Sequence, residues 1–97
     1  MLLLSTLRAG PEHGWGLART IERRSGGALV VEEGSLYPAL ARLRRSGWVR
    51  DEPGRSANNR PARFYRLTAA GRRESVRQER LWREFAAGVA GVMMSNP

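Results

Sequence analysis

Short apolar runs, separated by glycine and proline, divide the chain into segments. The first run, Leu2–Ala9, is followed by Gly10-Pro11, a pair of residues that ends a helix. In the second run, Trp15–Arg24, apolar residues recur on one face and arginines lie on the others. Gly26-Gly27 follows this run and ends it in the same way. The pattern therefore predicts two short helices.

A third helix is predicted over Ser35–Ser46, after a β-like stretch at Ala28–Val31. Leu36, Leu40 and Leu43 recur at i, i+4 and i+7, which places them on one side of a helix. The other side and its flanks carry polar and basic residues: Ser35, Tyr37, Pro38, Ala41, Arg42 and Arg45. Pro38 is expected in the first turn, where its missing N–H would have no partner in any case.

A β-hairpin is predicted after the third helix. Trp48–Arg50 opens the first strand, and Arg63–Leu67 alternates as the returning strand. Between them, Pro53–Ala62 is rich in glycine, asparagine and proline and is expected to be a long loop. Arg60 and Arg63 place positive charge in or beside the tip of this hairpin.

The last part of the chain predicts one long helix, which Thr68 can cap and which runs to about Met94. Its first half is polar, and its second half carries an apolar stripe: Leu81, Trp82, Phe85, Val89 and Val92. From Trp82 onward the stripe steps by three, four and three residues, the spacing of a helix–helix contact. Because a core of this size is marginal alone, the stripe predicts a homodimer.

Together these segments predict a mainly α protein with a small β-hairpin (α+β), in the arrangement of a winged helix-turn-helix. Residues 1–67 would form the DNA-binding domain and residues 68–97 a C-terminal dimerisation helix. In this arrangement the third helix enters the major groove and the hairpin tip follows phosphates. The alternative is a small helical domain whose arginines only solvate its surface.

Composition supports a polyanionic partner. The 97 residues hold 17 basic and 9 acidic side chains, for a net charge of +8, and every basic residue is arginine. Such an excess favours double-stranded DNA, although a GC-rich genome would also raise the arginine content. The chain has no cysteine, and its single histidine, His13, cannot form a usual metal site or catalytic triad. We therefore predict neither an enzyme nor a cofactor, and His13 is expected to be structural.

No segment predicts a membrane span. The apolar runs Met1–Leu4 and Ala86–Met94 are far shorter than the roughly 20 residues that a membrane helix needs. No basic region precedes the first run, so we predict no signal peptide. These features and the absence of cysteine predict a cytoplasmic protein.

Three stretches in order, His13–Leu17, Gly34–Leu43 and Arg60–Gly71, resemble the PadR family of bacterial transcriptional regulators. The resemblance covers nearly the whole chain. It implies a winged-helix homodimer that binds a pseudo-palindromic operator and represses transcription. It also implies that the C-terminal helix forms much of the dimer contact, and that several more residues usually precede the first helix.

The resemblance implies DNA contacts for six residues: Ser35, Tyr37, Pro38, Arg42, Arg60 and Arg63. The helical periodicity places Arg45 on the same face as Arg42, so we expect Arg45 to contact DNA as well. An alternative for Tyr37 is that it packs partly against the core. In some relatives an aromatic at the place of Trp82 stacks against a flat aromatic effector, whereas the alternative is a dimer-core tryptophan. Asn59 stands where a glycine is common in the hairpin tip, and asparagine also tolerates a left-handed backbone. A rival function is a winged-helix protein-interaction module without sequence-specific DNA binding.

Overall fold

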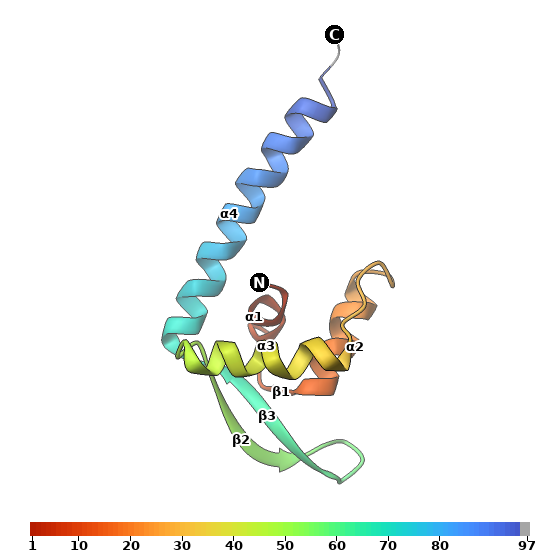
Figure 1. The fold of residues 1–97 in the computed structure, drawn as a ribbon, viewed down its shortest axis with the longest axis vertical. Helices are drawn as coiled ribbons and strands as arrows, with labels where there is room; N and C mark the ends of the chain where they lie inside the picture. Colours follow the sequence, from red (N-terminus) through yellow and green to blue (C-terminus); the bar gives the residue numbers. More distant parts are fainter. Residues whose placement is uncertain (96–97) are drawn as a thin grey trace.

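The computed structural model describes residues 1–95, and this part of the chain contains four helices and three strands (Figure 1). The elements are α1 (Leu2–Leu7), β1 (Glu12–His13), α2 (Gly14–Arg24), α3 (Glu33–Arg45), β2 (Val49–Arg55), β3 (Pro61–Leu67) and α4 (Ala69–Met93). The predicted fold class, mainly α with a small hairpin, is therefore confirmed. The predicted division at residue 67 stays a prediction, and the last two residues of its second part, 96–97, lie outside the described residues.

The hairpin is longer and tighter than the sequence predicted. The strands continue to Arg55 and start again at Pro61, so most of the expected loop Pro53–Ala62 is paired β-structure. Asn59 makes this possible because its φ of 58° is left-handed and closes a three-residue turn. The N–H of Asn59 donates to the carbonyl of Ser56 at 2.8 Å. The expected tolerance of asparagine at this position is thus confirmed.

The predicted β-like stretch Ala28–Val31 is wrong. These residues form an irregular link, and the side chains of Leu29 and Val30 are 45% and 66% exposed. The third strand is instead Glu12–His13, which pairs antiparallel with β3 to give the sheet order β1-β3-β2. Its two residues are too few to give a periodic signal, whereas Ala28–Val31 has no strand beside it to pair with.

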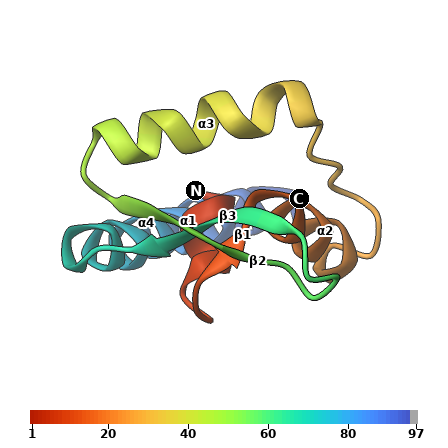
Figure 2. The same cartoon turned by 90° about the horizontal axis from the view of Figure 1, so that it is seen from below.

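The core lies between the helices and one face of the sheet. Figure 2 shows α3 on one side of the molecule, apart from the layer that holds the other helices and the strands. The buried cluster is Leu4, Leu7, Leu17, Ala18, Leu36, Leu40, Val49 and Tyr65. Leu36 and Leu40 are buried and Leu43 is partly buried, so the predicted leucine face of α3 is confirmed.

The position of Pro38 differs from the prediction. Because α3 begins at Glu33, Pro38 is the sixth residue of the helix and lies in its second turn. Its nitrogen has no hydrogen to donate to the carbonyl of Gly34, which therefore lacks its usual helical partner. Both residues are exposed, so water can pair with that carbonyl.

α4 starts at a close junction with the rest of the fold and then projects away from it (Figure 1). Thr68 caps the helix as predicted, since its Oγ1 accepts from the N–H of Gly71 at 3.0 Å. Further along, Glu79 pairs with Arg8, which directly follows α1. The projection gives the molecule its long dimension, with extents of 57 × 29 × 22 Å. Within residues 1–95, no helix has the length and apolarity to cross a membrane.

Candidate nucleic-acid interface

The outward face of α3 carries the five predicted contact residues of this helix. Ser35, Pro38, Arg42 and Arg45 are all exposed. Tyr37 is 44% exposed, and its ring also covers the start of α2: a Cβ added to Gly14 would lie 2.9 Å from Tyr37 Cε1. Tyr37 therefore packs against α2 with the edge that includes its hydroxyl, and the rest of its ring is exposed. The alternative, that Tyr37 packs partly against the fold, is supported, and its contact with DNA stays a prediction.

Arg60 lies at the tip of the wing, the hairpin formed by β2 and β3. It is exposed, and among residues 1–95 no carboxylate pairs with it. The tip itself is braced, because Arg55 donates to the carbonyl of Asn59 at 3.2 Å. A charged side chain on a fixed tip is well placed to meet a phosphate.

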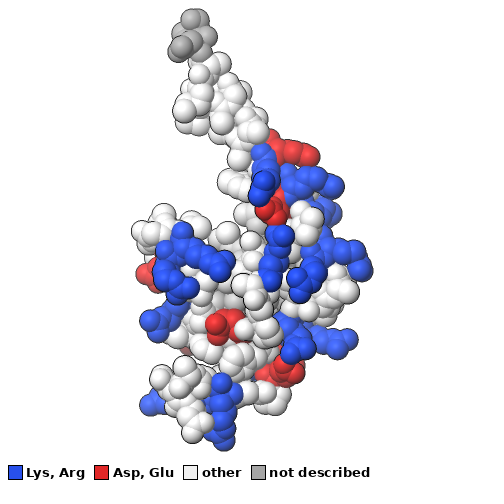
Figure 3. Space-filling model, turned by 180° about the vertical axis from the view of Figure 1, so that it is seen from behind, with Lys and Arg blue, Asp and Glu red and all other residues white. Residues whose placement is uncertain are grey.

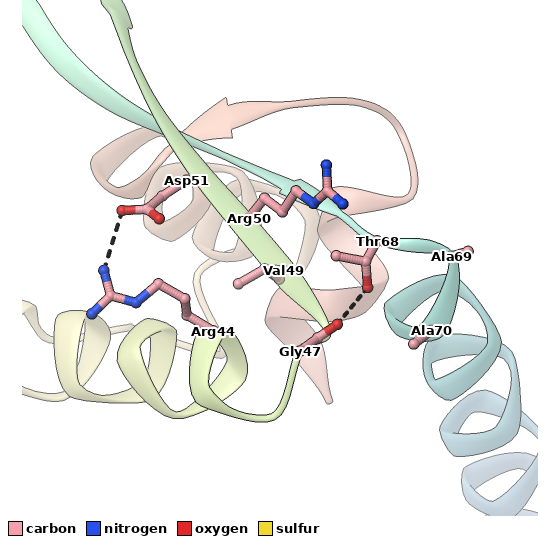
Figure 4. Close-up of a pocket in the computed structure, with 8 residues that line it drawn as sticks. All are labelled: Arg44, Gly47, Val49, Arg50, Asp51, Thr68, Ala69 and Ala70. Atoms are coloured by element: carbon pink, nitrogen blue, oxygen red, sulfur yellow. Dashed lines mark hydrogen bonds and ion pairs between the residues drawn. The ribbon is translucent and has the colours of Figure 1, made fainter.

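Arg63 has a different environment. Its Nη1 lies 3.4 Å from Oδ2 of Asp51, on the neighbouring strand. The same oxygen lies 3.3 Å from Nη1 of Arg44, which comes from α3 (Figure 4). Arg63 and Arg44 are each still 55% exposed at the side chain, so both remain open to a partner.

Asp51 and Arg44 were missed by reading the sequence. The two residues are seven positions apart on different elements, so no periodic pattern joins them. The one available signal was a pair of adjacent acidic residues, Asp51 and Glu52, in a basic hairpin. Asp51 also acts on Tyr65, which faces it in the sheet register: burial, and then the negative charge of Asp51, raise the pKa of the Tyr65 hydroxyl.

His13 holds the amino end of α2. Its Nδ1 accepts from the N–H of Gly16 at 2.9 Å. Its ring and that of Phe64 are nearly perpendicular, with centroids 5.5 Å apart. A free N–H at the start of the helix is thereby satisfied. His13 thus has the structural role that the sequence predicted. Within residues 1–95, no group of three His, Asp or Glu side chains is arranged to hold a metal.

The predicted apolar stripe lies on the projecting half of α4 and has no cover from residues 1–95. The exposed fractions are 44% for Leu81, 51% for Trp82, 64% for Phe85, 39% for Val89 and 79% for Val92. The rings of Trp82 and Phe85 lie 5.9 Å apart, tilted by 38°. Beyond Glu84 the helix carries no charged side chain. In Figure 3 this part of the helix is white, and the rest of the molecule below it carries many blue arginines.

Comparisons with known proteins identify relatives. The model of the transcriptional regulator PadR-like family matches residues 3–77. No curated protein sequence matches the chain.

Solved structures share the fold. A PadR family transcriptional regulator from Eggerthella lenta is 25% identical, with a TM-score of 0.78, over 98% of this chain and 83% of that one. A PadR-like transcriptional regulator from Bacillus cereus is 18% identical, with a TM-score of 0.83, over 97% of this chain and 89% of that one. Bacillus subtilis PadR in complex with operator DNA is 21% identical, with a TM-score of 0.69, over 79% of this chain and 42% of that one.

Proposed function

Because the chain belongs to the PadR-like family of transcriptional regulators, we propose that it is a repressor that binds a pseudo-palindromic operator as a homodimer. The observation that carries this proposal is the exposed polar face of α3 beside a wing with a basic tip. The complex of Bacillus subtilis PadR with operator DNA supports the same kind of partner. Repression then follows from occupying the operator. A protein that acts on chromosomal DNA works in the bacterial cytoplasm.

The two proposed DNA-binding arms, α3 and the wing, make different kinds of contact with DNA in this proposal. α3 reads base edges in the major groove, with Arg42 and Arg45 as hydrogen-bond donors and Ser35, Tyr37 and Pro38 near its amino end. The wing holds phosphates through Arg60 and Arg63. Base contacts then give sequence preference, whereas phosphate contacts add affinity for any DNA.

The dimer part of the proposal rests on the uncovered stripe of α4. Burying one large apolar side chain contributes roughly 1.5–3 kcal/mol. The five side chains of the stripe are 39–79% exposed, so each still has apolar surface to bury. Exposed apolar surface of this kind marks an interface. A second copy, with the same apolar stripe on α4, offers a matching surface and would place two α3 helices on one operator.

The selection of genomic fragments by the purified protein tests DNA binding and yields the operator. Arg42→Ala is then expected to lose roughly 1–3 kcal/mol on the operator and less on random DNA. Arg60→Ala weakens binding to both DNAs alike and lowers the salt slope by about one. Arg73→Ala is the control, since it removes the same charge from an exposed site on α4. Failure to enrich any fragment would favour the rival function, a module that binds only proteins.

Light scattering tests the dimer with two variants of one helix. Phe85→Glu places a charge in the stripe, and Ala87→Glu places it about 200° further round the helix, on the opposite face. We expect a monomer for the first variant and a dimer for the second. Removal of Leu81–Pro97 should likewise give a monomer or an insoluble chain. A Phe85→Glu variant that stays dimeric would contradict this interface.

A further inference from the structure

Asp51 ties the two proposed DNA-binding arms together. A single oxygen, Oδ2, lies within 3.4 Å of a guanidinium from α3 and of one from β3, those of Arg44 and Arg63. The Asp51 side chain is only 15% exposed, so water screens these contacts less than it would on an open surface. One anion thus joins two cations that belong to two different elements.

The contacts of Asp51 with Arg44 and Arg63, called the tie below, lie close to the place where the wing loses its third strand. β1 pairs with β3 only at Phe64 and Tyr65, and Asp51 lies opposite Tyr65. From the pair Pro53–Arg63 to the tip, the hairpin is a two-stranded ribbon, which is only marginally stable by itself. Within residues 1–95, the bond from Arg44 to Asp51 is the one side-chain hydrogen bond between α3 and the sheet (Figure 4).

We propose that Asp51 is a positioning residue for DNA recognition, which fixes the angle between the wing and α3 through Arg44 and Arg63. This inference rests on the proposed binding of DNA. An operator must meet base contacts from α3 and phosphate contacts from the wing in one register. Random DNA, which is held mainly by its phosphates, makes no such demand. Loss of the tie therefore lowers discrimination between the two DNAs rather than affinity in general.

The neighbouring residue provides a matched control. Glu52 follows Asp51 on the same strand, and its side chain lies on the other face of the sheet, 3.1 Å from Arg66. Asp51→Asn and Glu52→Gln each remove one negative charge from the hairpin and free arginine from an ion pair. They have the same effect on net charge, but only Asp51→Asn releases α3 from the wing.

The experiment measures dissociation constants on the selected operator and on random DNA at one salt concentration. Glu52→Gln is expected to strengthen both and to leave their ratio within about twofold of wild type. Asp51→Asn is expected to lower the ratio about tenfold, which corresponds to 1.4 kcal/mol. Arg44→Gln, at an exposed position, should lower it in the same direction. The double variant should be no worse than Asp51→Asn alone, because both changes break one tie.

A second measurement needs no DNA. Amide hydrogen exchange in β2 and β3 should be faster in Asp51→Asn than in wild type, and unchanged in Glu52→Gln. If circular dichroism shows that Asp51→Asn is unfolded, Arg44→Gln takes its place in the DNA-binding and hydrogen-exchange measurements. A wild type that prefers its operator, with equal ratios in the Asp51 and Glu52 variants, overturns this inference alone. A wild type that binds no DNA overturns the proposed function, and unchanged exchange in the wing overturns the tie itself.

Discussion

A close approach between two backbone segments predicts a large effect for a very small substitution, Gly71→Ala. Gly71 is buried at the start of α4, and a Cβ there would lie 1.8 Å from the carbonyl oxygen of Trp48. It would also lie 2.7 Å from the carbonyl carbon of the same residue. The obstacle is backbone rather than a mobile side chain, so α4 must move away from the end of the α3–β2 turn.

The cost can be bounded. Forcing one methyl group into a packed site costs typically about 1–3 kcal/mol, and the gain from alanine in place of glycine in a helix returns about 1 kcal/mol. A clash this short lies at the upper end of the first range, so we expect a net loss of about 2 kcal/mol. Trp48 O also accepts from the N–H of Thr68 at 3.0 Å, and movement of α4 would strain that bond as well.

Urea unfolding at one fixed protein concentration, followed by circular dichroism, measures the loss. Gly91→Ala is the control, because Gly91 lies in the same helix and, apart from its chain neighbours and the nearby backbone of α4, no described atom lies within 4 Å of the position of its Cβ. That variant should be as stable as wild type or slightly more so. If Gly71→Ala unfolded at the same urea concentration as Gly91→Ala, the close approach of α4 to Trp48 would be refuted.

Three further changes test other contacts. His13→Ala should lower the free energy of unfolding by about 1 kcal/mol by removing the cap of α2, while His13→Asn should keep most of it, both measured in urea. Arg8, and then Arg83, hold the pKa of Glu79 below 4.5 in the folded chain. Glu79→Gln should therefore be less stable than wild type at pH 7, and this difference should vanish in thermal melts as the pH falls through the acid range below 4.5. We propose that Trp82 stacks on a planar aromatic effector, so such compounds should quench wild-type fluorescence more than that of Trp82→Phe and shift operator affinity; equal quenching without an effect on DNA would leave Trp82 as dimer core.

The elements that the sequence predicted well are those whose pattern repeats within one element. The leucine face of α3 is such a case, since Leu36 and Leu40 lie one helical turn apart and are buried as expected. The cap at Thr68 is another, because the capping residue lies directly before its helix. Local rules suffice for these features, and the surrounding fold did not override them.

The features that the sequence did not predict depend on pairing between distant segments. The strand Glu12–His13 exists because β3, some 50 residues later, offers it hydrogen bonds. Ala28–Val31 has similar or better β-propensity and no partner, so it stays irregular. The contact of Asp51 with Arg44 and Arg63 is equally non-local, because it needs the hairpin to fold back over α3 before the three side chains meet.

The parts of the molecule that we propose for DNA recognition and for assembly meet at one junction. Thr68 caps α4 and donates its hydroxyl to the carbonyl of Gly47, at the end of α3, over 2.6 Å. Gly71 packs against the backbone of Trp48, the residue that follows Gly47. If two copies associate through α4, the distance between their α3 helices depends on this junction, because the start of α4 contacts Gly47 and Trp48, directly after α3. Operator half-site spacing would then be set here, by backbone contacts that tolerate no added side chain.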